Sequence, residues 1–189
     1  MRREGVLMAV DYFGRYFTDE GFKFTELIND DFFQPVRLLF QNRHYVSASK
    51  LLFVAIDSIG FIEYGDERGN TFIKWLDTYS DIQKLGITSA ELWEHRNSLL
   101  HMSNLNSRIV KSGHTRMLVG YVGNMPVEVK LDTDKTGYYE IPSLIKTIGE
   151  ACGKWCLTYD KERDKIHKFV ERYDLIASDA RMLEIPLEK

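Results

Sequence analysis

The run YVSASKLLFVAIDSIGFIEY, residues 45–64, is the most apolar segment of this 189-residue chain and sets its fold class. Placed on a helix, these residues are apolar nearly all round, and a helix of that kind is normally buried among others. We therefore predict a central buried helix from Tyr45 to about Tyr64, with Gly65 following its end. We do not expect any apolar run of the chain to span a membrane.

Shorter segments around this run also have helical spacing. Apolar residues recur every three or four positions from Leu7 to Phe17, which predicts a short amphipathic helix. The Asn-Asp-Asp cluster at 29–31 predicts an N-cap for a second helix, which carries Pro35 in its first turns, where proline is best tolerated. Residues 71–81 predict another short helix. These segments supply the packing partners that a central helix needs.

The following helix begins at a capping signal. Thr88 is followed three residues later by Glu91, the spacing of a capping box, in which each side chain accepts a hydrogen bond from a backbone N–H group at the start of the helix. We expect this helix to run to about Leu105. It carries the most informative polar residues of the chain.

The pattern changes after this helix. Short segments rich in β-branched and aromatic residues predict a β insertion at about 115–141, either a hairpin or a small three-stranded meander. Helical spacing returns in C-terminal helices at about 142–175. The sequence thus predicts a mainly α fold, a helical bundle with a small β insertion, formed by a single domain of residues 1–189. The strands are expected at 115–122, 126–131 and 136–141.

Composition limits the classes of function. The formal net charge is −3, whereas proteins that coat nucleic acid carry a basic face that releases counterions from the phosphates. Any role with nucleic acid must therefore rest on a few cations in one cleft, or on a cleft completed by a second chain. Cys152 and Cys156 are expected to be reduced core residues. No signal peptide, metal site or cofactor motif is recognised, and the predicted location is the cytoplasm.

The segment EHRNSLLH, residues 94–101, holds the candidate site. Asn97 and His101 are four residues apart and share one face of the predicted helix. Arg96 lies about 100° to the side, but a long guanidinium side chain can reach round. The helix is thus predicted to present a cation, an amide and an imidazole toward one cleft.

Asp57 and His95 are two further polar residues close to this pattern. Asp57 interrupts the apolar helix, and a carboxylate there should be paired, neutralised or at the mouth of a site, because unpaired burial is costly. It is predicted either to support the site or to anchor a structural hydrogen bond. His95 is adjacent to Arg96 but points to a different face, so it is predicted to be structural.

The arginine and histidine pattern resembles the R-x4–6-H signature of the HEPN superfamily. The stretch at 43–58 is similar to that family's apolar helix with an embedded polar residue, and the resemblance extends over roughly residues 45–106. It implies a HEPN-like helical bundle that forms a homodimer, with the two motifs facing each other across a composite site. It also implies endoribonuclease activity without a metal or other cofactor, with a 2′,3′-cyclic phosphate as product.

The resemblance assigns a role to each residue. Arg96 would stabilise charge on the phosphate, and His101 would act as general acid or base. Asn97 and Asp57 would position groups. The expected substrate is RNA and the expected setting is defence or stress response, with a protein inhibitor or other partner left open. Ser103 stands where a related group of HEPN toxins carries a tyrosine, so control by modification of that tyrosine is not predicted.

Two alternatives stay open. Arg96 could pair with a nearby carboxylate such as Glu91 or Glu94, and His101 could be a satisfied structural histidine. Alternatively, the HEPN-like fold could be correct while the protein is a catalytically inactive nucleotide-binding or protein-interaction module. The oligomeric state separates these readings, because the ribonuclease hypothesis needs two copies of the motif in one cleft.

Overall fold

The computed structural model describes residues 14–102, 110, 112–125 and 132–177, with the side chains of His101, Met102 and Ala177 outside the description. The protein is mainly helical, as predicted. Its elements are η1 (Gly14–Tyr16), β1 (Phe17–Thr18), β2 (Gly21–Phe22), α1 (Phe24–Ile28), η2 (Asn29–Phe33), α2 (Gln34–Gln41), α3 (Tyr45–Tyr64), α4 (Thr71–Tyr79), η3 (Ile82–Leu85), α5 (Ser89–Asn97), η4 (Ser98–Met102), β3 (Met117–Tyr121), β4 (Thr136–Glu140), α7 (Ile141–Lys161) and α8 (Lys165–Ala177).

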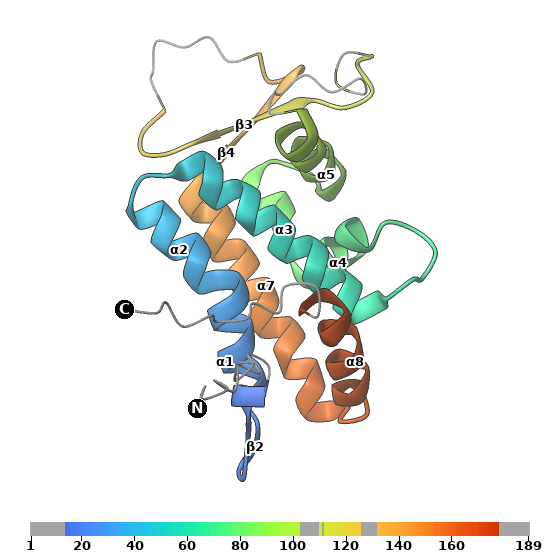
Figure 1. Ribbon diagram of the computed structural model, residues 1–189. Coiled ribbons are helices and arrows are strands. Elements are labelled where there is room, and N and C mark those ends of the chain that lie inside the picture. The colour runs from blue at the N-terminus through green and yellow to red at the C-terminus, as the bar shows by residue number, and fades with distance from the viewer. Residues whose placement is uncertain (1–13, 103–109, 111, 126–131, 178–189) are drawn as a thin grey trace, which may run out of the picture.

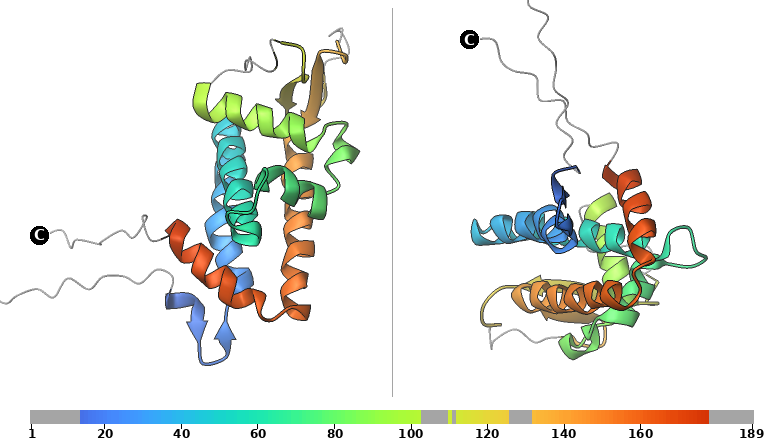
Figure 2. Two further views of the ribbon diagram at one scale, coloured as in Figure 1. Left: turned by 90° about the vertical axis from the view of Figure 1, so that its right-hand side faces the viewer. Right: turned by 90° about the horizontal axis from the view of Figure 1, so that it is seen from below.

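Helix α3 lies at the centre of the molecule and has the bounds that the sequence predicted. It packs against α2, α4, α7 and α8, and Figures 1 and 2 show α2, α3 and α7 side by side along the bundle. Gly65 follows its last residue with a φ of 61°, a conformation that favours glycine. The core-facing residues of α3 are fully buried, among them Leu52, Phe53, Ile56 and Ile59. Burial of this apolar surface is the main stabilising contribution to the fold.

The helical run Phe24–Gln41 differs from the prediction. Helix α1 passes without a break into the π-helical turn η2, which passes into α2. The cluster at 29–31 therefore lies inside the helix, and the prediction of an N-cap there is wrong. Pro35 gives a physical reason for the π turn, because a proline inside an α-helix lacks an N–H group and clashes with the carbonyl four residues earlier.

The N-terminal prediction is tested only at its end, since residues 1–13 lie outside the described residues. Residues Gly14–Tyr16 form a 3-10 turn, and β1 pairs antiparallel with β2. The prediction of a helix as far as Phe17 is therefore wrong. The rings of Phe17 and Phe22 stack across this hairpin with centroids 4.7 Å apart, which stabilises the strands that replace the last helical turn.

Helix α4 lies very close to α3, and its position matters for the site. A Cβ atom added at Gly60 of α3 would lie 2.9 Å from the carbonyl oxygen of Thr71. Glycine therefore allows the two backbones to approach. The side chain of Asn70 caps α4 by accepting a hydrogen bond from the Ile73 N–H at 3.1 Å. The start of α4 is thereby fixed against the C-terminal part of α3.

Helix α5 begins at the predicted capping box, which is confirmed. The Thr88 side chain accepts a hydrogen bond from the Glu91 N–H at 3.2 Å, and Glu91 accepts one from the Thr88 N–H at 2.8 Å. The helix does not run on regularly, because the π-helical turn η4 replaces its continuation after Asn97. Residues 103–109 lie outside the described residues. Figure 2 shows α5 lying across the end of the bundle, beside β3 and β4.

The β insertion is present, but its pairing corrects the prediction. Strands β3 and β4 pair directly and in parallel, from Met117 opposite Thr136 to Tyr121 opposite Glu140. A hairpin would pair them antiparallel, and a meander would place a third strand between them, so both predicted arrangements are wrong. The predicted strand at 126–131 lies outside the described residues. The sequence pattern identifies strand segments but not their relative direction, and in the structure β3 packs against α5 and β4 against α7.

Helices α7 and α8 confirm the predicted return of helical structure. Their inner faces bury large aromatic side chains around Phe24, namely Trp155, Tyr159, Phe169 and Tyr173. Cys152 and Cys156 are free, as predicted, with their Sγ atoms 4.0 Å apart on one face of α7. This aromatic cluster holds the end of the bundle that is opposite α5 (Figure 1).

Helix α3 is long and apolar enough to cross a membrane, contrary to the expectation from sequence, and it is the one such helix among the described residues. Half of its apolar window is buried by other parts of the protein. The core helix of a soluble protein meets the same criterion, so length and composition do not distinguish the two cases.

Candidate functional site

Arg96 and Asp57 form an ion pair between α5 and α3. The Arg96 Nε donates to Asp57 Oδ2 at 2.7 Å, and the Nη2 group contacts the same oxygen. The two side chains are 18% and 26% exposed. Arg96 therefore does not pair with Glu91, one of the carboxylates suggested by the sequence. Two predicted site residues that lie 39 positions apart in the chain meet at one point.

Asn97 and Trp93 hold the same guanidinium from two other directions. The Arg96 Nη1 donates to Asn97 Oδ1 at 2.9 Å. The guanidinium carbon lies 4.9 Å from the centroid of the Trp93 ring, within the range of a cation–π interaction. Since Trp93 precedes Arg96 by three residues on α5, the two lie on one face of the helix. Arg96 is thus fixed in place by a carboxylate, an amide and an aromatic ring.

The π-helical turn η4 changes the helical register at the site. In an α-helix, residues five apart such as Arg96 and His101 are separated by about 140° around the axis. A π turn joins residues five apart by its hydrogen bonds, so it reduces that separation. The backbone at position 101 is consequently nearer the Arg96 side of the helix than the sequence-based helix would place it. The side chain of His101 lies outside the described residues.

Two contacts attach α5 to the β insertion. Glu91 accepts hydrogen bonds from Arg116, from Nε at 2.6 Å and from Nη2 at 3.1 Å. Burial raises the pKa of the Glu91 carboxyl, but the hydrogen bonds from Arg116 and Thr88 and the charge of Arg116 outweigh burial and leave its pKa below the usual value. The second contact joins His95 Nε2 to the Tyr139 hydroxyl at 2.9 Å. Both ends of α5 are therefore held in position.

His95 is a buried structural histidine. Its ring is 6% exposed and packs edge-on against Phe53 and Tyr139. Burial lowers its pKa from 6.5 to about 4, because the charged form would lose its hydration. The side chain is therefore neutral at pH 7 and serves to join α5 to α3 and β4.

The depressed pKa of His95 predicts a loss of stability in acid. Between pH 6.5 and 4 the unfolded chain takes up a proton at His95 that the folded protein excludes, so stability falls as pH falls. One pKa unit is worth about 1.4 kcal/mol, so the total loss is about 3 kcal/mol. We expect urea unfolding to show this slope in the wild type and a flatter one in His95→Gln. The exposed His167 offers a control, since His167→Gln should keep the wild-type slope. Equal slopes in wild type and His95→Gln would contradict the assignment of the acid-dependent loss of stability to His95.

A small hollow of about 320 Å³ adjoins the Arg96 site. It is lined by Asp57, Trp93 and the residues that begin α4, Gly69, Asn70 and Thr71. Its position follows from the close approach of α4 to α3, which brings the start of α4 beside Asp57. Asp57 and Trp93 therefore both line the hollow and contact the Arg96 guanidinium.

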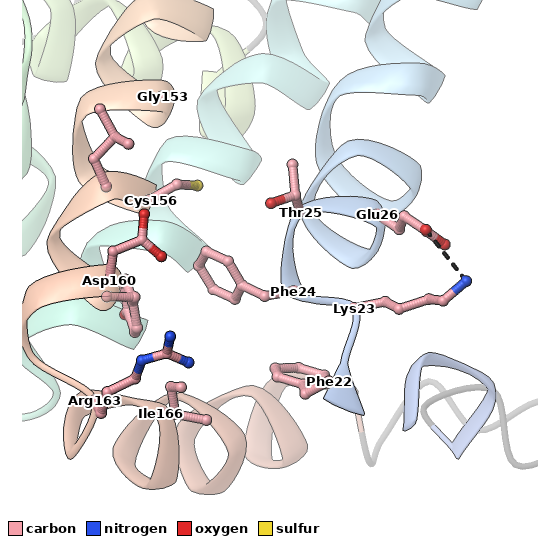
Figure 3. A pocket seen from close by; sticks show the side chains of 12 residues that line it. Phe22, Lys23, Phe24, Thr25, Glu26, Gly153, Cys156, Asp160, Arg163 and Ile166 are labelled. Atoms are coloured by element: carbon pink, nitrogen blue, oxygen red, sulfur yellow. Dashed lines mark ion pairs between the residues drawn. The ribbon is translucent and has the colours of Figure 1, made fainter. Parts of the chain in front are cut away.

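A second hollow, of about 650 Å³, lies away from this site between the start of α1 and the helices α7 and α8 (Figures 1 and 3). Figure 3 shows the Phe24 ring between Cys156 and the Phe22 ring, with Asp160 and Arg163 near one edge. Its lining is mostly apolar, and it contains none of the predicted site residues. Within the described part of the chain, no group of three or more His, Cys, Asp or Glu side chains is placed to hold a metal ion.

Comparison with protein-family models, with curated proteins and with solved structures gives no match. The site therefore has to be judged from its own geometry. The structure brings together Asp57, Arg96 and Asn97 from the predicted set. Trp93 was not identified as a site residue from the sequence, although its spacing of three residues from Arg96 was a usable signal. Asn70 carried no such signal, because only the packing of α4 on α3 brings it near.

Proposed function

We propose that this protein is a metal-independent endoribonuclease of the HEPN type that acts as a homodimer. The observation that supports this most is the fixed Arg96 guanidinium, held by Asp57 and Asn97 five residues before His101 on the same helical segment. A guanidinium whose orientation is set in advance can stabilise charge on a phosphate without reorganising during the reaction. Asp57 and Asn97 are positioning residues in this proposal.

The proposed chemistry uses His101 and Arg96 together. An imidazole that titrates near neutral pH can accept the proton of a ribose 2′-hydroxyl or donate one to the leaving 5′-oxygen. Attack of the 2′-oxygen on phosphorus breaks the bond to the 5′-oxygen and leaves a 2′,3′-cyclic phosphate. Arg96 binds the phosphate oxygens as negative charge accumulates on them. The reaction balances without a metal ion or other cofactor.

Exposed apolar residues on the side of α3 that carries Asp57 support pairing of two copies. Val46 and Val54 of α3 are 61% and 43% exposed. They are eight residues apart, and Asp57 follows Val54 by three, so these positions lie along one side of the helix. A second copy covering this side would bring two Arg96 groups near one cleft. It would also explain how a chain with a net charge of −3 can bind RNA.

Cleavage of RNA in EDTA tests the proposal. We expect the wild type to be dimeric by light scattering and to release fragments that end in 2′,3′-cyclic phosphate. Loss of general acid–base catalysis in His101→Ala should lower the rate roughly 10²- to 10⁴-fold. His167→Ala, which removes an exposed histidine of α8, should cleave as the wild type does. Cleavage that needs a divalent metal, or that survives in His101→Ala, would refute the proposed mechanism.

A second function is favoured by one specific observation. Asp57 balances the charge of Arg96, and Asn97 and Trp93 occupy other sides of the guanidinium. An arginine whose charge and hydrogen-bonding groups are used within the protein is also consistent with a structural role for Arg96. The protein would then be a catalytically inactive nucleotide-binding or protein-interaction module. Absence of cleavage from a folded wild-type dimer, tested on both structured and single-stranded RNA, would favour this function over the ribonuclease.

A further inference from the structure

The hollow beside Arg96 has the features of a subsite for a flat, polar ligand. Its volume of about 320 Å³ is at the lower end of the range for small-molecule sites, roughly 300–1,000 Å³. Trp93 lines it together with Gly69 and Thr71 at the start of α4. Gly69 adds no side chain, which leaves room at the entrance. The hollow is therefore shallow, partly aromatic and next to Asp57, the partner of Arg96.

Trp93 provides an aromatic surface in this hollow. It is partly exposed, in contrast to the fully buried Trp75 and Trp155. Its ring contacts Phe72 at a centroid distance of 5.4 Å with an interplanar angle of 55°, and this contact holds the ring in place. Aromatic side chains in such positions stack on unpaired nucleobases, which is how proteins commonly recognise single-stranded RNA.

Asp57 and Asn70 place opposite hydrogen-bonding groups in the same hollow. The Asp57 carboxylate has two oxygens and can accept several hydrogen bonds, including those from Arg96. Asn70 uses its amide oxygen to cap α4, so its NH₂ group is the part of the side chain that can donate to a ligand. The hollow therefore combines an acceptor from α3 with a donor from the start of α4.

We propose that this hollow binds the guanine base of the nucleotide adjacent to the cleaved bond. Guanine carries two neighbouring N–H donors, N1–H and N2–H, beside the acceptor O6. Asp57 would accept from the two donors, Asn70 would donate to O6, and Trp93 would stack on the ring. Adenine presents an acceptor, N1, where guanine presents N1–H, so it would leave the carboxylate facing a lone pair. This inference rests on the proposed function, since it assigns a base preference to the same site.

Binding of nucleoside monophosphates tests the inference without any cleavage. The chain has three tryptophans, and their indole N–H signals can be followed by NMR during titration with guanosine or adenosine 5′-monophosphate. We expect guanosine monophosphate to shift the Trp93 signal. The buried Trp75 and Trp155 serve as internal controls and should not shift. Equal shifts with both nucleotides, or no shift of Trp93 with either, would overturn the proposal.

Two substitutions separate base recognition from folding. Serine is as good an N-cap as asparagine, so Asn70→Ser keeps the cap of α4 while removing the NH₂ donor. We expect it to reduce the preference for guanine over adenine several-fold, leaving the part that comes from Asp57, with an unchanged melting temperature. Trp93→Ala should weaken guanosine monophosphate binding about tenfold, measured by calorimetry. An undiminished guanine preference in Asn70→Ser would contradict the contact assigned to Asn70.

The binding and cleavage results distinguish failure of this inference from failure of the proposed function. Guanine-selective binding by a protein that cleaves no RNA would refute the ribonuclease and keep the base subsite. Metal-independent cleavage that depends on His101, but occurs equally after every base and without guanine-selective binding, would refute the subsite and keep the ribonuclease.

Discussion

Substitution of Arg96 by lysine is expected to slow RNA cleavage nearly as much as substitution by alanine, roughly 100-fold or more. Lysine keeps the positive charge, but a single ammonium group cannot contact Asp57 and Asn97 as the guanidinium does and still meet a phosphate bidentately. The effect should appear in the rate at saturating RNA, because the guanidinium is proposed to act on charge that accumulates during the reaction. Single-turnover cleavage in EDTA would measure it.

Arg116 provides the matched control for this substitution. Like Arg96, it forms an ion pair with a carboxylate, that of Glu91, and connects α5 to another element. It differs in position, because it directly precedes β3 and contacts the first turn of α5 rather than the proposed site. Arg116→Lys should leave the cleavage rate within about twofold of wild type, well below the effect of losing a transition-state donor. Rapid cleavage by a folded Arg96→Lys protein would show that charge alone suffices and that the fixed geometry of Arg96 does not serve catalysis.

Substitution of Glu63 by alanine is expected to produce the largest loss of stability, about 3–5 kcal/mol. The Glu63 side chain is 9% exposed and accepts hydrogen bonds from Lys165 Nζ at 2.7 Å, Trp155 Nε1 at 2.8 Å and the Tyr79 hydroxyl at 2.9 Å. Burial raises the pKa of Glu63, but these hydrogen bonds and the charge of Lys165 outweigh it and leave the pKa below its usual value. The carboxylate thus joins α3, α4, α7 and α8.

Removal of this carboxylate leaves a partly buried ammonium and two polar groups without their partner. Urea unfolding should show the loss as a lower midpoint with a similar slope. Glu67→Ala is the control, because its ion pair with Lys74 is exposed and should contribute less than about 1 kcal/mol. Glu63→Gln should lose less than Glu63→Ala, since an amide oxygen still accepts hydrogen bonds. A loss from Glu63→Ala no larger than that of Glu67→Ala would contradict the role given to this network.

Features set by local sequence were predicted closely. The bounds of α3 were correct because a helix that is apolar nearly all round can be recognised from composition and spacing alone, and the glycine after it ends the helix through its own backbone freedom. The capping box of Thr88 and Glu91 was also correct, since both partners lie within one helical turn. The mainly helical character of the protein and the free state of Cys152 and Cys156 followed from equally local evidence.

Features that depend on contacts between distant residues could not be predicted from the sequence pattern. The sequence identified Asp57 and Arg96 separately, but their ion pair needs the packing of α5 on α3, and the hollow beside them needs the start of α4 as well. The parallel pairing of β3 with β4 likewise depends on packing against other elements, α5 and α7. The π turn after Asn97 replaces the α-helix that local spacing predicted. Composition and spacing therefore specified the central helix and the start of α5, and identified the candidate polar residues. The packing of helices far apart in the chain brought those residues together, because contacts between distant segments leave no periodic signal in the sequence.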